Sequence, residues 1–525
     1  MKKRQVKTRS ILGTLLIKLA IIAMVLLVAS YLKLRLDFSA NKAYSLSKVS
    51  KQAVRGLEDN LVIKVFASEE LPPELSTLDR YMKDLLAEYQ IASKGKFHYE
   101  FIRGLSMDEL RYQAQENGLS SMYFRIYEND KTTNKEVIFG LVFEYQGKFD
   151  SMNLLPQMEA KLEYELTQKI QKLSQYALPE ISVFRDSMMV QMPTKGFDEA
   201  LANNFKVVET DLKSPPKQTP AMIFTGVIGD LSDQQLYNLD QYIMKGGKPV
   251  FLQDRVSTDG NSLFILESNI FSFLEHFGVR IDKNIAMDIF CDLRSIGVDN
   301  TLPFPIYPVL RGSQHPITRN LADIVMYMAN GLGFTNKPGK RFMSILNTSS
   351  SSAMVMAPEY RLDPALFENP DPSIFNLPPI VLGAITEGEA ESYFNNRPEL
   401  QSADHKSRTD EFKMVVYGDR DLVIDADKSI YADRVYIVLN AVDWLLGRES
   451  MISIRARHLQ RSILDITYYM HKNDIVWGDP ARIEKRIKTG IKLVSTVLPS
   501  LILLIIGGFI ALHRKQLQGV NNEED

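Results

Sequence analysis

The sequence predicts an α/β protein with one transmembrane helix near each end of the chain. Two observations carry this prediction: apolar runs stand at residues 11–32 and 493–512, and between them short apolar segments alternate with amphipathic helical ones. A helix needs about 20 apolar residues to cross the hydrocarbon core of a bilayer. Alternating strands and helices are typical of a mostly parallel sheet that helices cover on both faces. We therefore expect two anchors and a large body between them.

Length and composition bound the possible functions. The 525 residues are 45% hydrophobic, which is enough for two or three packed cores. The net charge is −2 and no recognition motif for nucleic acid is present, so nucleic acid is excluded as a partner. The single cysteine, Cys291, excludes an internal disulfide and a CxxC redox pair.

The first predicted span, residues 11–32, follows a basic tip at residues 1–10. Its one charged residue, Lys18, costs roughly 3 kcal/mol near a helix centre, which the surrounding Leu, Ile and Val residues offset. We expect the Lys18 side chain to reach toward the lipid headgroups, with a buried contact to a partner as the alternative. A cleaved signal peptide competes with this interpretation because small residues stand at 28–30, but the length of the apolar run favours a retained anchor.

The second predicted span, residues 493–512, carries features that could serve a helix partner. Pro499 should kink this helix, and the pair Gly507 and Gly508 would let another helix approach closely. The alternative is that these small residues are merely tolerated in lipid, since no full GxxxG pattern is present.

Flanking charges set the predicted orientation. Basic residues in the N-terminal tip, and others in the tail at 513–525, place both ends of the chain in the cytoplasm. A juxtamembrane helix at 476–492 is also basic, but the charge rule weakens beside a long translocated domain. Its cations are expected to contact lipid phosphates or a partner's acidic rim; the candidates are Arg482, Lys485 and Arg486. We therefore expect a bacterial cytoplasmic-membrane protein whose bulk lies on the extracytoplasmic, periplasmic side.

Residues 33–177 are predicted to form a thioredoxin-like α/β domain without a CxxC motif. A short helix begins at Ser47, a natural N-cap, and a strand, a helix and a second strand then form a βαβ unit at residues 61–103. Further strands and a long helix at 158–175 complete the unit. Thioredoxin chemistry needs a thiolate at the start of the first core helix. The segment ASEELPPELS has no cysteine there, so redox catalysis is excluded.

Residues 178–475 are predicted to form a larger, mostly parallel α/β domain of the flavodoxin or amidotransferase type. Its expected strands include ISVF, KVVETDL, AMIFTGV, PVFLQD, RFMSILNT, PPIVLGAIT and FKMVVYGDRDLVI. Helices are expected at SDQQLYNLDQYIMK and YIVLNAVDWLLG. The polar and proline-rich segment 347–373 is expected to be a surface loop.

The glycine pair in KGGKPVFLQD resembles a phosphate loop only superficially. A Walker loop lies between a strand and the start of a helix, whereas Gly246 and Gly247 follow a helix and precede a strand. We interpret them as a helix C-cap, where glycine adopts the left-handed conformation without penalty. A second near match, GFTNKPGKR at 333–341, has the wrong spacing and lacks the required Ser or Thr. We expect neither a nucleotide site nor any other cofactor.

Hydrolase motifs are also absent from the sequence. It contains no GxSxG and no HExxH, and its seven histidines are never spaced as metal ligands on one helix. A carboxylate pair brought together by folding stays possible among 64 acidic residues. Asp419 and Asp421 lie just beyond a predicted strand, where α/β folds keep ligand crevices, although a plain polar turn is the simpler interpretation.

A series of segments resembles the GldG family, an auxiliary, substrate-binding-like membrane subunit of ABC transporters associated with gliding motility. The matching segments are RLDFSANKAYSLS, VIFGLVFEYQGKFDSMNLL, LEYELTQKIQKLS, LDQYIMKGGKPVFLQD, HPIT, ILNTSS, ITEGEAESYFNNR, VVYGDRDLV and LNAVDWLLGRESMISIR. They follow one another in order over nearly the whole chain. The family often has a Gly-His-Gly-Glu-like turn after the strand ISVF, whereas this chain has RDSMMVQMP, which puts any ligand role of that turn in doubt.

The resemblance implies a non-catalytic subunit that works with a multispanning ABC permease and a cytoplasmic ABC ATPase. Such a subunit would couple its partners, through the lipid bilayer, to an unknown envelope cargo or machine. Two alternatives stay open: a membrane-anchored envelope enzyme acting on glycan or peptide, and an envelope scaffold independent of any transporter.

Overall fold

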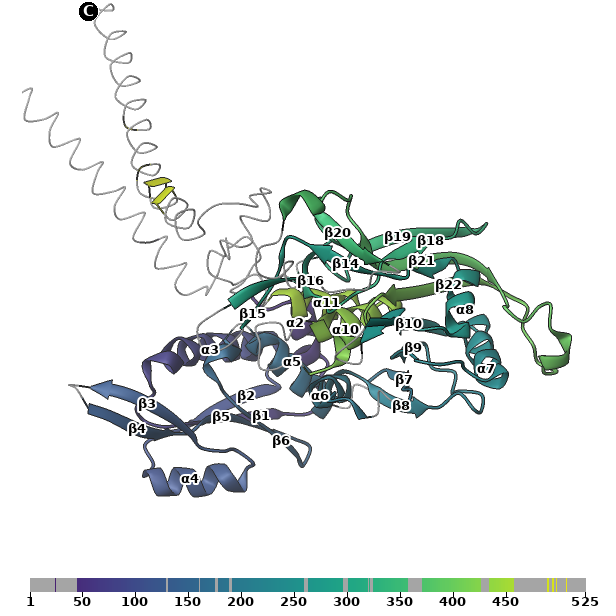
Figure 1. Ribbon diagram of the computed structural model, residues 1–525. Helices are drawn as coiled ribbons and strands as arrows, with labels where there is room; N and C mark the ends of the chain where they lie inside the picture. Colours follow the sequence, from purple (N-terminus) through teal and green to yellow (C-terminus); the bar gives the residue numbers. More distant parts are fainter. Residues whose placement is uncertain are drawn as a thin grey trace, which may run out of the picture. The chain divides into compact units, whose positions relative to one another are not determined.

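The computed structural model describes most of the chain between residues 45 and 457 (Figure 1). Breaks in that range lie at 129–130, 160, 175–177, 188–190, 259–262, 296–300, 320, 322–323, 357–370 and 426–433, and beyond it only Met24, Thr489, Gly490, Leu493, Val494, Val497 and Gly507 are described. The chain divides into two compact units, Met1–Ser174 (unit 1) and Gln175–Asp525 (unit 2).

The predicted fold class needs correction. Across the described residues, no helix is both long enough and apolar enough to span a bilayer. The longest of the described helices, α3 (Pro73–Ala92), carries charged residues along its length, including Asp79 and Lys83. The two transmembrane helices are therefore not borne out, and the structure is a mixed α/β protein. Residues 11–32 and 493–512 lie outside the described part except for Met24, Leu493, Val494, Val497 and Gly507.

Unit 1 is built on a four-stranded sheet with the order β2-β1-β5-β6. Strands β1 and β2 are parallel and joined through α3, as the predicted βαβ unit requires, whereas β5 and β6 run antiparallel. The elements are α2 (Lys48–Arg55), β1 (Leu61–Ala67), α3, β2 (Phe97–Ile102), α4 (Met107–Glu116), β3 (Met122–Glu128), β4 (Lys131–Val137), β5 (Phe139–Tyr145), β6 (Lys148–Asn153), η1 (Pro156–Met158) and α5 (Leu162–Leu173).

Helices cover the two faces of this sheet unequally. The face with Ile63, Val65 and Phe143 packs against α2, α3 and α5, while α4 is the one helix among the described residues that packs on the other face. The predicted N-cap of α2 is confirmed, because Ser47 Oγ accepts the Ser50 amide hydrogen at 3.0 Å. The short α4 leaves part of its face to solvent, and Phe149 there is 63% exposed.

Unit 2 contains a ten-stranded sheet whose main path is β15-β16-β19-β21-β22-β10-β9-β7-β8, with β17 paired to β16. From β8 to β22 every neighbouring pair is parallel. From β22 to β15 every pair is antiparallel. The main-path strands are β7 (Glu180–Phe184), β8 (Lys206–Thr210), β9 (Ala221–Phe224), β10 (Lys248–Leu252), β15 (Cys291–Ser295), β16 (Thr301–Gly312), β19 (Lys340–Asn347), β21 (Val381–Glu391) and β22 (Arg408–Tyr417).

The expectation of a mostly parallel sheet is thus correct for only half of it. In chain order the parallel strands have the arrangement 2-1-3-4-5, which is the flavodoxin-like order. Parallel neighbours require crossover connections, which α6 (Lys195–Asn204) and α7 (Asp233–Met244) supply. Strand β21 pairs antiparallel with β19 on one side and with β22 on the other.

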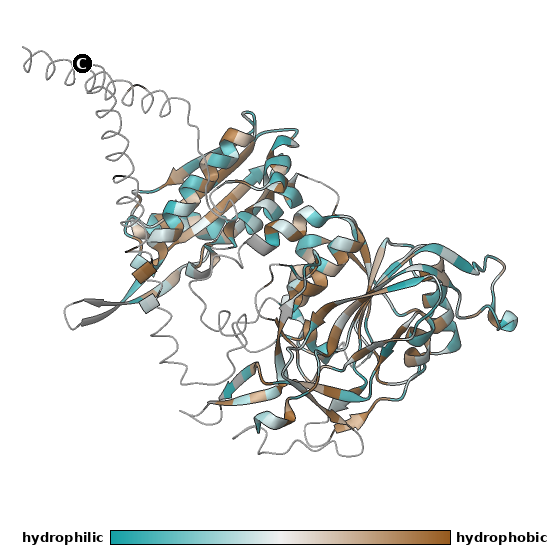
Figure 2. Cartoon of the chain, turned by 90° about the horizontal axis from the view of Figure 1, so that it is seen from above, coloured by the Kyte–Doolittle hydropathy of each residue, from teal (hydrophilic) through white to brown (hydrophobic). Residues whose placement is uncertain are grey.

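Two apolar layers enclose the parallel half of the sheet. One layer includes α6 and α10 (Arg434–Leu445), and the other includes α7 and α8 (Asn269–His276). Strand β22 is buried on both faces, with Val415 in the first layer and Val416 in the second. Burying each such side chain contributes about 1.5–3 kcal/mol. Figure 2 shows the hydrophobic residues concentrated on the strands of the sheet.

The remaining elements of unit 2 are short. They are β11 (Val256–Thr258), β12 (Leu263–Ile265), β13 (Val279–Ile281), β14 (Asn284–Asp288), β17 (Ile324–Val325), β18 (Leu332–Phe334), β20 (Ser352–Met356), η3 (Pro372–Ile374), η4 (Pro398–Leu400), η5 (Arg420–Val423) and α11 (Glu449–Arg457). The expected loop 347–373 is therefore wrong at β20, which pairs with β14 and buries Ala353 and Val355.

Candidate functional site

The carboxyl ends of two neighbouring parallel strands bring several charged side chains together. Strands β10 and β22 are paired at Leu252 and Tyr417, so Asp254 and Asp419 follow them at the same edge of the sheet. Ligand sites of open α/β sheets lie at this edge. We call the group formed here by Asp254, Asp419, Arg420, Asp421 and Arg434 the strand-end cluster.

Asp254 is held by Arg420 through two contacts. The Arg420 amide donates to Asp254 Oδ1 at 2.8 Å, and the Arg420 Nε lies 3.0 Å from Asp254 Oδ2. The same guanidinium donates from Nη2 to Ser257 Oγ of β11 at 2.9 Å. Because the Arg420 side chain is 5% exposed, it forms a buried link between the end of β22 and the segment that follows β10.

Asp419 organises the turn after β22. Its Oδ1 accepts the Asp421 amide hydrogen at 2.7 Å, which caps η5, and its Oδ2 accepts the Tyr327 amide hydrogen at 2.8 Å. The preceding residue must be glycine, because a Cβ on Gly418 would lie 2.1 Å from the Asn330 carbonyl oxygen. Asp419 thus fixes both the turn and the neighbouring segment.

Arg434, the first residue of α10, closes the cluster from the other side. Its Nη2 donates to the Ile424 carbonyl at 3.0 Å and its Nη1 to the Asp421 carbonyl at 3.4 Å. The guanidinium also lies 4.1 Å from the ring centroid of Tyr327, a favourable cation–π distance. The side chain of Arg434 therefore joins α10, η5 and the Tyr327 segment.

The charges of the cluster do not balance, since three carboxylates face two guanidinium groups. Burial raises the pKa of Asp254 well above its usual value, and the charge of Asp421 raises it further. The same two causes raise the pKa of Asp419 to about 7. Partial burial also raises the pKa of Asp421, while Arg420 and Arg434 oppose that shift. Burial and the excess of carboxylates thus both favour the protonated forms of these aspartates.

This arrangement favours a structural clamp over catalytic chemistry. Both carboxyl oxygens of Asp254 and of Asp419 already face main-chain amides or Arg420, which leaves them poorly placed to move protons on a substrate. Asp421, whose side chain is 38% exposed, is the carboxylate of the three that faces solvent most. Among the described residues, no group of three or more His, Cys, Asp or Glu side chains is arranged to hold a metal ion.

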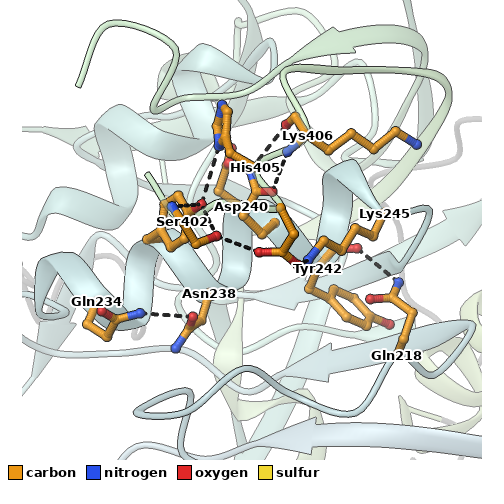
Figure 3. A network of polar contacts seen from close by, with 12 residues as sticks. Gln218, Gln234, Asn238, Asp240, Tyr242, Lys245, Ser402, His405 and Lys406 are labelled. Atoms are coloured by element: carbon orange, nitrogen blue, oxygen red, sulfur yellow. Dashed lines mark hydrogen bonds and ion pairs between the residues drawn. The ribbon is translucent and has the colours of Figure 1, made fainter. Parts of the chain in front are cut away.

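A second buried polar assembly joins α7 to the segment between β21 and β22, as Figure 3 shows. We call it the α7 network, made of Tyr237, Asp240, Gln241, Ser392, Tyr393, Ser402, His405 and Lys406. Asp240 is fully buried and accepts from Ser392 Oγ at 2.6 Å, from the Tyr393 amide at 2.8 Å and from Gln241 Nε2 at 2.9 Å. These bonds fix the segment on the helix.

The α7 network continues through Gln241 and Tyr237. The side chain of Gln241 accepts the Lys406 amide hydrogen at 2.8 Å, and its Nε2 lies 3.0 Å from His405 Nδ1. The Tyr237 hydroxyl accepts the Ser402 amide hydrogen at 2.8 Å. At the end of α7, Lys245 pairs with Asp404 at the surface. The network is therefore a docking device within unit 2, formed mostly by uncharged groups.

The structure confirms that the glycine pair ends α7. Gly246 has a φ of +97°, the left-handed value expected of a C-cap glycine, and its amide donates to the Ile243 carbonyl at 2.9 Å. Gly247 is needed for a different reason, because a Cβ there would lie 2.4 Å from the Tyr242 ring. The other near match, 333–341, is the connection between β18 and β19, with Gly339 at a φ of +73°.

The other predicted contact residues fall almost wholly outside the described part of the chain. This holds for Lys18, Arg482, Lys485, Arg486, Pro499 and Gly508. Gly507 is described as helical and exposed. Among the predicted candidates that the structure describes, it brings Asp419 and Asp421 together, and the roles of all the candidates stay predictions.

Sequence reasoning missed Asp254, Arg420 and Arg434 as members of the cluster. A signal for Asp254 was present, because PVFLQD and VVYGD both place an aspartate two residues beyond a buried strand. Parallel neighbours put such residues at one edge. Arg434 offered no comparable signal, since it opens a helix well after the turn that it contacts.

A known protein family matches the part of the chain that contains the strand-end cluster. Residues 167–435 match the auxiliary family described as an ABC-type uncharacterized transport system, over just more than half of the chain. The chain belongs to this family. The family region runs from α5 of unit 1 to the start of α10 and includes every member of the strand-end cluster. Residues 40–144 match a separate domain family of unknown function.

Individual relatives add little beyond the family. An uncharacterized protein of Borreliella burgdorferi is 19% identical over 473 residues, covering 86% of this chain and 89% of the relative. The N-terminal domain of mmIFT52 is 15% identical with a TM-score of 0.33, covering 51% of this chain and 97% of that domain. Gan42B, a GH42 β-galactosidase, is 7% identical with a TM-score of 0.25, and this chain spans only 33% of its length. Structural likeness at these scores carries no functional argument.

Proposed function

We propose that this protein is a non-catalytic accessory subunit of an ABC transport system. It would act beside a multispanning permease and a separate cytoplasmic ATPase, and engage envelope cargo or machinery. The observation that carries the proposal is the family match over 167–435, which spans the parallel half of the unit 2 sheet and most of its insertions. The GldG resemblance suggests gliding or a secretion-like process as the setting, and the outer face of a bacterial cytoplasmic membrane as the location.

Two structural features support an accessory role. The glycine pair, the nearest approach of the sequence to a phosphate loop, caps α7 and has no helix start beside it. At the edge of the sheet where α/β folds bind ligands, the carboxylates of Asp254 and Asp419 already accept hydrogen bonds from main-chain amides of neighbouring loops. A subunit of this kind would obtain its energy from a partner that hydrolyses ATP.

An envelope enzyme is the second candidate, and one observation favours it. The strand-end cluster gathers three carboxyl groups whose pKa values are raised, which is a common property of catalytic acids. The occupied oxygens of Asp254 and Asp419 count against this role. Asp421 would then have to serve as the catalytic acid. The variant Asp421→Asn separates the two candidates, because an enzyme would lose its activity whereas an accessory subunit would keep its partners.

The test of the accessory role is purification of the intact complex. The native chain, tagged at one end, would be isolated from gently detergent-extracted bacterial membranes, and its stoichiometric companions identified by mass spectrometry. We expect an ABC ATPase and a permease, with ATP hydrolysis by the complex and none by the chain alone. A stable complex that lacks any nucleotide-binding subunit, or ATP turnover by the isolated chain, would contradict the proposal.

A further inference from the structure

A pocket of about 360 Å³ lies between α6 and the strands β7 and β8 of unit 2. We call it the α6 pocket. Its polar lining consists of Arg185, Thr194, Asp198 and Glu209, and its apolar lining of Leu201, Ala202 and Val207. Arg185 directly follows β7, one of the two strands between which the order of the parallel half reverses. Val207 and Glu209 belong to the edge strand β8, on the other side of β7 from that reversal, so the pocket is separate from the crevice where doubly wound sheets bind ligands. Its volume suits a small molecule or one long side chain.

Arg185 is fixed in the pocket by α6. Its Nη1 donates to Thr194 Oγ1 at 3.1 Å, its Nη2 pairs with Asp198, and the Thr194 hydroxyl in turn donates to Asp198 at 3.0 Å. The Arg185 side chain is only 13% exposed. These contacts hold the guanidinium against α6, while its Nε faces the other carboxylate of the pocket.

Glu209 is that other carboxylate, and Arg185 satisfies it poorly. Its Oε1 lies 3.6 Å from Arg185 Nε, beyond the usual N–H···O hydrogen-bond distance. Partial burial raises the pKa of Glu209, and the negative charge of Asp198 adds to this shift while Arg185 opposes it. Arg185, Asp198 and Glu209 thus give the pocket a net charge of −1 when both carboxylates, whose side chains are 48% and 60% exposed, are ionised.

The apolar wall of the pocket limits which class of cation could bind there. A bare metal ion is disfavoured, because the pocket offers only two carboxylates and holds a fixed guanidinium beside them. An aliphatic stem can lie along Leu201, Ala202 and Val207 while a charged head stays at the polar end. An ammonium suits the carboxylates, since it is a compact charge with three rotatable donors.

We propose that the α6 pocket binds an alkylammonium group, whose charge pairs with Glu209 and whose alkyl chain follows the apolar wall. The group could come from a lysine side chain of a protein or from a free aliphatic amine. The simpler alternative is that Arg185 and its partners only tie α6 to the sheet. That alternative predicts no ligand and leaves the unbalanced charge in place. The inference does not depend on the transport role.

The experiment is a methyl NMR titration of the full chain, observing Leu201, Ala202 and Val207. The probes are n-butylammonium chloride and the peptide acetyl-Gly-Lys-Gly-amide, and the uncharged controls are n-butanol and the same peptide with norleucine. We expect saturable shifts with the two cations and much weaker ones with the controls. Tighter binding of the lysine peptide than of n-butylammonium assigns the site to a lysine side chain, and the reverse order assigns it to a free amine.

Variants separate the pocket from general charge effects. Glu209→Gln should weaken binding of both cations about twofold to fivefold, as expected for loss of one partly exposed ion pair. Glu199→Gln is the matched control, because Glu199 is similarly exposed but lies on α6 outside the pocket lining, where it pairs with Lys195. Glu209→Ala serves as a second variant if Glu209→Gln disturbs the methyl spectrum. The proposal would be overturned if the cations and the uncharged controls caused equal methyl shifts, or if neither caused any. It would also be overturned if the two glutamate variants weakened cation binding equally.

Discussion

The strand-end cluster and the α7 network are two buried polar assemblies of unit 2 that handle charge in opposite ways. In the cluster, Asp254 relies on the cation Arg420, and three carboxylates share two guanidinium groups. In the network, Asp240 is met by a hydroxyl, a main-chain amide and a carboxamide. Both assemblies join segments that are distant in sequence. The difference shows that two segments can be joined either through buried ion pairs, whose stability depends on charge, or through hydrogen bonds to uncharged groups, whose stability depends mainly on geometry.

Removing Arg420 from the strand-end cluster should lower the stability of unit 2 more than any other change proposed here. Arg420→Met leaves Asp254 buried without its charged partner, which should lower the free energy of unfolding of unit 2 by about 3–5 kcal/mol. Urea unfolding followed by the fluorescence of Trp444 in unit 2 measures this change. The matched control is Arg408→Met, because Arg408 pairs with Glu389 and Asp410 at the surface and should cost under about 1 kcal/mol. Equal losses in both variants would erase the distinction between the cluster and an ordinary surface pair.

The corresponding change in the α7 network should be smaller and more local. Asp240→Asn replaces an acceptor of three hydrogen bonds with a group that has one acceptor oxygen, at a cost of about 1–3 kcal/mol. Hydrogen exchange should accelerate in residues 392–407, which the network holds on α7, while β10 keeps its protection. Faster exchange throughout unit 2 would mean that the network supports the whole sheet and not only this segment.

The cluster should also give unit 2 a characteristic pH dependence. Burial raises the pKa of Asp419 from 3.8 to about 7, so between these values the folded state binds more protons than the unfolded state. Stability should therefore fall as pH rises through this window, by at most about 1.4 kcal/mol per pH unit for one proton. The measurement compares urea midpoints of the native chain and Asp419→Asn from pH 5 to 8. If the two chains show the same slope, Asp419 does not titrate in this range.

The smallest effect is expected at the exposed end of the α7 network. Lys245→Ala removes a pair with Asp404 in which the two side chains are 37% and 72% exposed. Such surface pairs contribute roughly 0–1 kcal/mol and are screened by salt. The unfolding midpoint should shift little, and the shift should vanish at high salt. A large loss that persists in salt would show that the network depends on charge after all.

Local patterns in the sequence predicted the elements whose causes are themselves local. The N-cap Ser47, the βαβ unit at 61–103 and the glycine end of α7 all follow from spacing and conformational preference, and the structure contains them. The position of Asp419 just beyond a strand was predictable for the same reason. Each of these features is decided by residues within a few positions of one another.

The remaining features depend on partners that a local pattern does not record. Strands such as β13 and β17 have three and two residues, too few for a periodicity to emerge. The antiparallel pairs of the sheet join strands such as β16 and β19, and the apolar pattern of one strand does not record the direction of its neighbour. Similarly, Arg455 in α11 is fully buried because it pairs with Asp443 of α10 at 2.8 Å, although arginine usually indicates a surface position. The charge of the strand-end cluster became visible only when β10 and β22 were found to be neighbours.

The adjacency of β10 and β22 has a consequence for how the chain acquires its structure during synthesis. Asp254 and Arg420, which meet at the ends of these strands, are 166 positions apart. Closing so long a loop is entropically slow, and contacts of this range reduce folding rates. The first four parallel strands therefore leave the ribosome well before β22, and the edge of β10 stays unpaired until β22 is synthesised. An unpaired apolar edge invites association with other chains. This interval is when the newborn polypeptide most needs a chaperone.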